Sequence, residues 1–280
     1  MSCHTLTDFE WDAIRVFLPA ERPSKVGRPW ESHRQIINGI LWVLCTGARW
    51  KDVPPEYGKH KTVYNRFYRW TKEGLWERIM AALLDRLDSK GLIDRSIWCV
   101  DSSVVRAHRV AAGARKGERD SAKNATKNAL GRSKGGYSTK IHIASDARGN
   151  VLAVTATPGE AGETPELPNL LSQIPLSQHL KSKRPKALAA DKAYSAKATR
   201  ESLKRKGIKP VIPKRKNEKH KGRFAKCLYR KRNIIERVIG WLKECRRIAT
   251  RYEKNVENYL ALIQIAAIRR MMKNLLKGRA

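Results

Sequence analysis

Three acidic residues stand apart from the strongly basic background of the chain. Asp101 lies inside an apolar stretch, WCVDSS, and Asp191 ends the short apolar stretch ALAAD. Glu236 follows in an amphipathic stretch, and residues 181–251 contain five acids against 26 lysines and arginines. A buried carboxylate must be paired or bind a cation. Three carboxylates among cationic side chains therefore predict a site for a divalent metal such as Mg²⁺, which prefers hard oxygen ligands and often binds substrate phosphates as well.

Such a site predicts phosphoryl transfer. Two ions about 3.5–4 Å apart can activate an attacking oxygen and stabilise the leaving one. Cationic and aromatic side chains close to the acids would hold the phosphodiester, and the best placed are Arg232, Lys243 and Tyr229.

Each acid also has a structural interpretation. Asp191 could cap the helix that follows it. Asp101 could pair with Arg106 or His108, and Glu236 could pair with neighbouring arginines on a surface helix. Any one carboxylate is therefore weak evidence for a metal site, whereas the three together, on two strands and a helix, are a much stronger indication.

The stretch YRKRNIIERVIGWLK (229–243) predicts one helix with two opposed faces. Gly240 lies one turn after Glu236 and predicts open space beside that carboxylate. Because glycine weakens a helix by ~1 kcal/mol, its presence suggests a need for close approach there. The apolar side of the helix would pack on a core. The opposite side would present Tyr229, Arg232, Glu236 and Lys243.

Strands and helices that could position the acids follow from residue 96 onward. The order is β-β-β-α-β-α-β-α, which predicts an α/β fold with a mixed sheet of the ribonuclease-H-like type. The basic segment 109–136 has no apolar period and is predicted as a long loop. The expected elements are strands at Ser96–Val105, Tyr137–Ser145, Val151–Thr157, Ala187–Asp191 and Lys209–Pro213, a hairpin turn at 146–150, a helix at Thr164–Ile174 capped by Thr164, a helix ending at Lys206, and a last helix from Asn255 to about Leu276.

The first ninety residues predict a separate, all-helical unit that resembles a helix-turn-helix DNA reader. Thr7 and Glu10 have the spacing of a capping box, and Ser32 with Gln35 begins a second helix. A third helix, His60–Lys72, carries a basic polar stripe of the kind that enters a DNA groove. The alternative is a helical bundle with a solvated charged face. The side chains expected to face outward toward DNA are Lys61, Asn65, Arg66 and Arg69.

The overall charge favours a nucleic-acid partner. The formal net charge is +33 and the pI is about 10.4, which implies a polyanion, with an anionic membrane a distant second. No apolar run is long enough to span a bilayer, and the N-terminus has no signal-peptide pattern. Five scattered cysteines without metal spacing fit a reducing cytoplasm. The expected partner is therefore DNA, without membrane association.

The spacing Tyr229-x2-Arg232-x3-Glu236-x6-Lys243 matches the signature of DDE transposases of bacterial insertion sequences. The blocks VDSSVVRAH (100–108) and ALAADKAYSA (187–196) resemble the surroundings of the first two acids in the insertion sequence 5 family. The N-terminal block from GRPWES to PPEYG is similar to that family as well. Ala193 stands where glycine is common in the family, which is a mild departure.

The resemblance implies a division into a DNA-end-binding domain (1–90) and a ribonuclease-H-like catalytic domain (91–280). It makes Asp101, Asp191 and Glu236 the catalytic and metal-binding triad, with two Mg²⁺ or Mn²⁺ ions. It also implies DNA contacts by Tyr229, Arg232, Lys243 and Lys192.

By the same resemblance, the N-terminal helices would recognise terminal inverted repeats, and the protein would act as a dimer on paired ends, in a bacterial cytoplasm in association with the nucleoid. All three acids are intact, so we expect an active enzyme that cleaves the ends and joins the 3′-OH to target DNA. Two other functions remain open. One is a ribonuclease-H-like nuclease that cuts without joining, and the other is a non-catalytic DNA-binding regulator.

Overall fold

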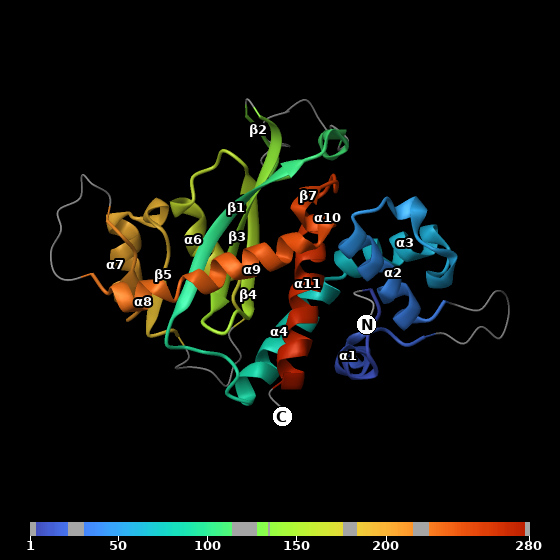
Figure 1. Cartoon of the computed structure of the whole chain (residues 1–280), viewed down its shortest axis with the longest axis horizontal. Coiled ribbons are helices and arrows are strands. Elements are labelled where there is room, and N and C mark those ends of the chain that lie inside the picture. Colours follow the sequence, from blue (N-terminus) through green and yellow to red (C-terminus); the bar gives the residue numbers. More distant parts are fainter. Residues whose placement is uncertain are drawn as a thin grey trace.

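A seven-stranded mixed sheet lies at the centre of the region from residue 98 onward in the computed structural model (Figure 1). The structure describes residues 4–21, 31–113, 128–133, 135–175, 184–214 and 224–277. The sheet strands are β1 (Trp98–Ala107), β2 (Gly131–Ser133), β3 (Gly136–Asp146), β4 (Val151–Pro158), β5 (Ala187–Ala189), β6 (Lys209–Val211) and β7 (Thr250–Arg251).

The strand pairing confirms the ribonuclease-H-like order. β3 pairs antiparallel with β1 on one side and with β4 on the other. β5 runs parallel to the first half of β1, and β6 runs parallel to β5. Two short strands were not predicted. β2 pairs with the start of β3, and β7 pairs with the end of β1. Their two or three residues carry no alternating pattern. The predicted long loop therefore contains β2, whereas its residues 114–127 and 134 lie outside the described part.

Helices cover both faces of the sheet. Successive side chains of a strand point to opposite faces, so Asp101 and Ser103 lie on one face of β1 and Ser102 on the other. Lys243 contacts Ser103 and Glu163 contacts Ser102, so each face has its own cover. The covering elements are η5 (Thr164–Glu166) with α6 (Leu167–Ser172) on one face and α9 (Asn233–Glu244) on the other. The remaining helices of this region are η4 (Arg109–Gly113), η6 (Lys192–Tyr194), α7 (Lys197–Arg205), α8 (Lys226–Arg230), α10 (Arg246–Ala249) and α11 (Val256–Lys277).

The first part of the chain is helical, as predicted. Thr7 and Glu10 form the capping box, and the Ser32 hydroxyl accepts a hydrogen bond from the Gln35 amide at 3.2 Å. The third and fourth helices are joined by Glu73 and Gly74. The elements are α1 (Asp8–Ile14), η1 (Arg15–Phe17), α2 (His33–Thr46), η2 (Trp50–Asp52), η3 (Pro55–Tyr57), α3 (His60–Lys72) and α4 (Leu75–Ser89).

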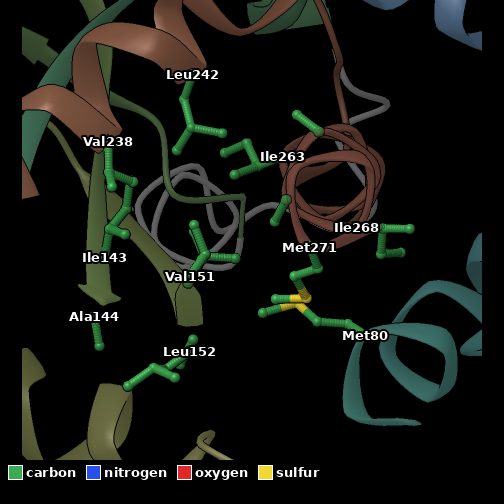
Figure 2. Close-up of a cluster of buried hydrophobic side chains, with 14 of the residues drawn as sticks. Met80, Ile143, Ala144, Val151, Leu152, Val238, Leu242, Ile263, Ile268 and Met271 are labelled. Carbon is green, nitrogen blue, oxygen red and sulfur yellow. The ribbon is translucent and has the colours of Figure 1, made fainter. Parts of the chain in front are cut away.

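One hydrophobic core links the helical part to the sheet. Val238 projects from α9 toward Ile143 of β3, Leu242 projects from the same helix into the same cluster, and Met271 of α11 meets Met80 of α4 (Figure 2). All five side chains are at most 5% exposed. The long α11 therefore acts as the common packing partner of α4 and the sheet region. No helix within the described ranges combines the length and the apolar character needed to cross a membrane.

Two local predictions were wrong. The predicted single helix 229–243 is broken: α8 ends at Arg230, and α9 begins at Asn233 after a tight turn in which the Ile235 amide bonds to the Arg232 carbonyl. Thr164 does not cap a helix by its side chain. Its hydroxyl donates instead to the Ala193 carbonyl at 2.7 Å, because a tertiary partner lies within reach.

Candidate active site

Asp101 lies in the middle of β1 and is held by two hydrogen bonds. Its Oδ1 accepts from the Ser102 amide at 2.9 Å, and its Oδ2 accepts from Nη1 of Arg232 at 2.7 Å. The side chain is 18% exposed. Burial raises the pKa of this carboxyl, against the opposing effects of the Ser102 hydrogen bond and of Arg232. Asp101 is thus a partly desolvated carboxylate that already has a cationic partner, although neither Arg106 nor His108 supplies it.

Asp191 is brought beside Asp101 by the ladder between β1 and β5. Cys99 pairs with Ala189 in this parallel ladder, and each aspartate lies two residues after its member of the pair. The proximity is also electrostatic, since the charge of Asp191 is one of the causes that raise the pKa of Asp101. Asp191 Oδ1 accepts from the Ala193 amide at 2.8 Å and so caps the short helix η6. The capping role and the position next to Asp101 therefore coexist.

Glu236 reaches the same place from the first turn of α9. Arg232, the N-cap residue of that helix, donates from Nη2 to Glu236 Oε1 and from Nη1 to Asp101. One guanidinium group therefore bridges the two carboxylates. The Glu236 side chain is 52% exposed, so this acid stands at the open side of the site. Its pairing with a neighbouring arginine was the predicted structural alternative, and that pairing is present.

The three carboxylates do not form a closed metal cluster in this conformation. Within the described ranges, no three His, Cys, Asp or Glu side chains gather closely enough to hold a metal ion. The reason is visible in the contacts: the Arg232 guanidinium stands between Asp101 and Glu236. A positive charge thus already lies where two carboxylates converge, and carboxylate oxygens are the ligands that Mg²⁺ and Mn²⁺ prefer. The donor set fits such ions.

The other residues of the predicted signature surround this bridge. The Arg232 guanidinium lies 5.6 Å from the centre of the Tyr229 ring in α8. Lys243, in the last turn of α9, donates to Ser103 Oγ at 2.7 Å. Burial lowers the pKa of Lys243. Lys192 is exposed and directly follows Asp191. Cations therefore line the face of β1 that carries Asp101.

The predicted DNA-facing stripe of α3 needs one correction. Lys61, Asn65 and Arg69 are exposed, but Arg66 is buried at 5% exposure. Its Nη1 lies 2.6 Å from Nδ1 of His33. Arg66 follows Val63 by three residues, which places it on the buried stripe of the helix. Arg66 therefore joins α3 to α2.

Sequence reasoning missed two exposed aromatic residues on α3. Tyr64 and Tyr68 are 37% and 38% exposed, and their rings stack with centroids 6.3 Å apart. They lie four residues apart, and this spacing was the available signal. Sequence reasoning also missed Glu163, which lies in no recognisable pattern and meets Ser102 only in the folded chain. It missed Ser103, the hydrogen-bond partner of Lys243, as well.

Two family models match the chain. Residues 93–271 match the model described as "Transposase DDE domain", and residues 6–80 match the one described as "Putative transposase of IS4/5 family". The first match alone covers more than half of the chain.

Similar proteins occur in several bacteria. The chain is 36% identical over 116 residues to protein y4sN of Sinorhizobium fredii, covering 41% of this chain and 87% of that protein. It is 32% identical over 132 residues to the "Putative transposase for insertion sequence element IS6501" of Brucella ovis, covering 46% of this chain and 93% of the relative. A similar protein of Burkholderia cepacia, the "Putative transposase for insertion sequence element IS402", is 32% identical over 130 residues, covering 45% of this chain and 59% of the relative.

Among solved structures, the Mos1 mariner paired end complex with Mn is similar at 12% identity, with 92% of this chain and 82% of that one covered. The TM-score is 0.32, so the two structures do not superpose closely.

Proposed function

Because this chain belongs to the family of transposases with a DDE domain, we propose that it binds the terminal inverted repeats of an insertion sequence, cleaves at the ends and joins the 3′-OH to target DNA. Asp101, Asp191 and Glu236 form the catalytic triad and hold two Mg²⁺ or Mn²⁺ ions. One observation carries the proposal. Asp101 and Asp191 follow the same pair of the β1–β5 ladder, and Glu236 converges with Asp101 on one guanidinium.

Arg232 has to leave the carboxylates before they can serve as ligands. Phosphate is a strong, bidentate partner for a guanidinium group, so a DNA phosphate is the natural alternative acceptor. In this mechanism Arg232 turns toward the DNA backbone and frees the space between Asp101 and Glu236. The two ions, when bound, supply activation of the attacking oxygen and stabilisation of the leaving one.

The cations around the site hold the DNA. Lys243 lies on the same face of β1 as Asp101, and Tyr229 lies under Arg232, so both are placed to position the scissile phosphodiester. Lys192 contributes a charge beside Asp191. On α3, the exposed side chains Lys61, Asn65, Arg69, Tyr64 and Tyr68 contact the DNA end. The formal net charge of +33 supports a wide phosphate footprint.

The first family match ends at residue 80 and the second begins at residue 93. This supports a boundary near residue 90 between an end-binding unit (1–90) and a catalytic unit (91–280). DDE enzymes act on paired ends, so the assembly is a homodimer on DNA. The similar proteins named above come from bacteria, which supports action in a bacterial cytoplasm on nucleoid DNA.

Strand transfer of a pre-cut end tests this function. The purified chain is incubated with Mg²⁺, an end duplex carrying a free 3′-OH, and a plasmid target, and joined products are separated by gel electrophoresis. Joined product is expected. Cleavage without joining would instead indicate a nuclease, and binding without either reaction would indicate a regulator.

Asp101→Asn tests the triad. The change removes a metal ligand and leaves the basic surface unaltered, so cleavage is abolished while binding to end DNA stays within about twofold of the parent's. Asp12→Asn, on an exposed position of α1, is the matched control and leaves both properties unchanged. If the Asp101 variant still cleaved DNA, the triad assignment would be wrong.

A further inference from the structure

The segment after β4 contacts a residue close to each aspartate: Ser102 of β1 and Ala193 of η6. Glu163 Oε1 accepts a hydrogen bond from the Ser102 hydroxyl at 2.6 Å. The next residue, Thr164, donates from Oγ1 to the Ala193 carbonyl at 2.7 Å. Adjacent residues have Cα atoms about 3.8 Å apart. Two adjacent residues therefore link the strand that carries Asp101 to the short helix that Asp191 caps.

The contacted residues lie one and two residues after a proposed metal ligand: Ser102 follows Asp101 directly, and Ala193 is the second residue after Asp191. The Ser102 amide donates to Asp101 Oδ1 at 2.9 Å, so Glu163 holds the residue that orients Asp101. The Ala193 amide donates to Asp191 Oδ1 at 2.8 Å, so Thr164 holds, through the carbonyl, the residue whose amide orients Asp191. In both cases the residue that is held also donates its amide hydrogen to an aspartate, although Glu163 accepts its hydrogen bond and Thr164 donates its own. Neither Glu163 nor Thr164 needs to touch a metal ion or DNA to act on the aspartates.

Glu163 is itself held in place. Lys140 Nζ lies 3.5 Å from Glu163 Oε1, and their side chains are only 12% and 18% exposed. The same ammonium group donates to the Ala161 carbonyl at 2.7 Å. On the other side of the segment, Leu167 is 2% exposed and anchors the start of α6 in the core. The segment is therefore fixed at both ends.

Tyr194 is a buried aromatic residue close to Glu163 and to both aspartates. Its side chain is fully buried. Burial raises the pKa of the phenol, and the charges of Glu163, Asp101 and Asp191 raise it further. The phenol is therefore close to three carboxylates. Because Glu163 and Thr164 are partly buried, the low local dielectric strengthens their hydrogen bonds.

We propose that Glu163 and Thr164 are positioning residues that set the separation of Asp101 and Asp191, and thereby the metal affinity of the site. The inference rests on the proposed function, because it takes the two aspartates as metal ligands. Residues that hydrogen-bond to the groups around a metal typically change its affinity by about 10–100-fold when they are mutated.

The test compares paired variants of the full-length chain. Thr164→Val keeps the shape and removes the hydroxyl, whereas Thr164→Ser keeps the donor. Glu163→Ala removes the acceptor, whereas Glu163→Gln keeps an oxygen for Ser102. Glu166→Gln, which removes a nearby charge that bonds to Asn169 rather than to Ser102 or Ala193, is the control.

Mn²⁺ binding without DNA is measured by isothermal titration calorimetry, after circular dichroism has established that each variant is folded. Thr164→Val and Glu163→Ala bind Mn²⁺ about tenfold more weakly, whereas the Ser, Gln and control variants stay close to the parent. Cleavage by the two weakened variants recovers at saturating Mn²⁺. A merely structural defect would lower cleavage at every metal concentration.

Asp101→Asn in the same titration separates the two hypotheses. If it weakens Mn²⁺ binding and the Val and Ala variants do not, the positioning role is wrong and the proposed function stands. If Asp101→Asn binds Mn²⁺ like the parent, the proposed function itself is contradicted. Should Thr164→Val melt below the assay temperature, the Glu163 pair decides the question by the same criterion.

Discussion

Arg232 places Nη1 2.7 Å from Oδ2 of Asp101, and its side chain is only 15% exposed. The contact joins the N-cap of α9 to the middle of β1, two elements that meet only in the folded chain. It gives the proposed metal ligands a cation from the chain itself. Under the proposed function, this guanidinium competes with metal ions for the carboxylates.

Arg232→Gln should tighten Mn²⁺ binding in the absence of DNA by about tenfold, since a hydrogen bond to a charged group contributes ~1.5–3 kcal/mol and ~1.4 kcal/mol is a factor of ten. The same variant should lose cleavage, because the proposed phosphate contact is missing. Titration calorimetry and a cleavage assay measure the two effects. Arg230→Gln, on the exposed side of α8, is the control and should change neither. Weaker Mn²⁺ binding by the Arg232 variant would contradict the competition.

Arg247→Met should destabilise the fold by about 3–5 kcal/mol, because it leaves Glu253 buried without its partner. Arg247 Nε lies 2.7 Å from Glu253 Oε1, with side chains 7% and 4% exposed, and its Nη1 donates to the Ala48 carbonyl at the end of α2. Urea unfolding measures the loss. The double variant Arg247→Met with Glu253→Leu should recover much of it.

The same pair predicts a pH dependence. Burial raises the pKa of the Glu253 carboxyl above 4.5, and Arg247 opposes the rise. The folded chain thus binds this proton more tightly than the unfolded chain, so the stabilisation from this group is full below the unfolded pKa and is lost as the pH rises through the folded pKa. Without Arg247 the pKa rises further. The loss of unfolding free energy caused by Arg247→Met should therefore be smaller at about pH 5 than at about pH 7.5. A larger loss at the lower pH would contradict a raised pKa of Glu253.

Gly240→Ala should raise the free energy of unfolding by ~0.5–1 kcal/mol, because glycine weakens a helix interior. No atom outside its own helix neighbourhood lies within 4 Å of a Cβ built at this position, so the methyl group meets no steric conflict. If DNA approaches closely beside Glu236, cleavage should fall in the same variant. Asn233→Ala, also exposed on α9, is the control and should leave cleavage intact. Unchanged cleavage by Gly240→Ala would mean that the glycine serves no close approach.

Two arginines of α3 should behave in opposite ways. Arg69→Gln should weaken binding to end DNA and reduce the slope of log K against log salt by about 0.9, the value for one lost phosphate contact. Arg66→Met should leave that slope unchanged and lower the melting temperature, because Arg66 is buried against His33. Fluorescence anisotropy at several salt concentrations measures the slopes. Equal slopes for the Arg69 variant and the parent would remove α3 from the DNA interface.

Features with a local pattern were predictable from the sequence. The alternation in Tyr137–Ser145 and the turn at 146–150 fixed β3 and its hairpin with β4, and the apolar context of Asp101 placed it in a strand. The position of Arg66 was also readable from its spacing to Val63, but its charge suggested an exposed residue.

Features set by tertiary contacts were not predictable. No glycine or proline marks the break between α8 and α9. The contacts that coincide with it are the Cys99 thiol on the Lys231 carbonyl and Arg232 on Asp101. Glu163 likewise acquires its partners only when β3, β1 and the segment after β4 meet.

The pairing of β1 with β5 fixes the relative position of two acids that are far apart in the sequence. Each aspartate lies two residues after its member of the pair Cys99 and Ala189. The relative position of the two carboxylates along the strands therefore does not depend on the length of the chain between β1 and β5. Insertions between the strands can therefore vary without moving one acid against the other. A single residue added or lost between Ala189 and Asp191 would turn the second carboxylate to the opposite face of the sheet. Length variation among such proteins should consequently avoid this short stretch and accumulate in the connections.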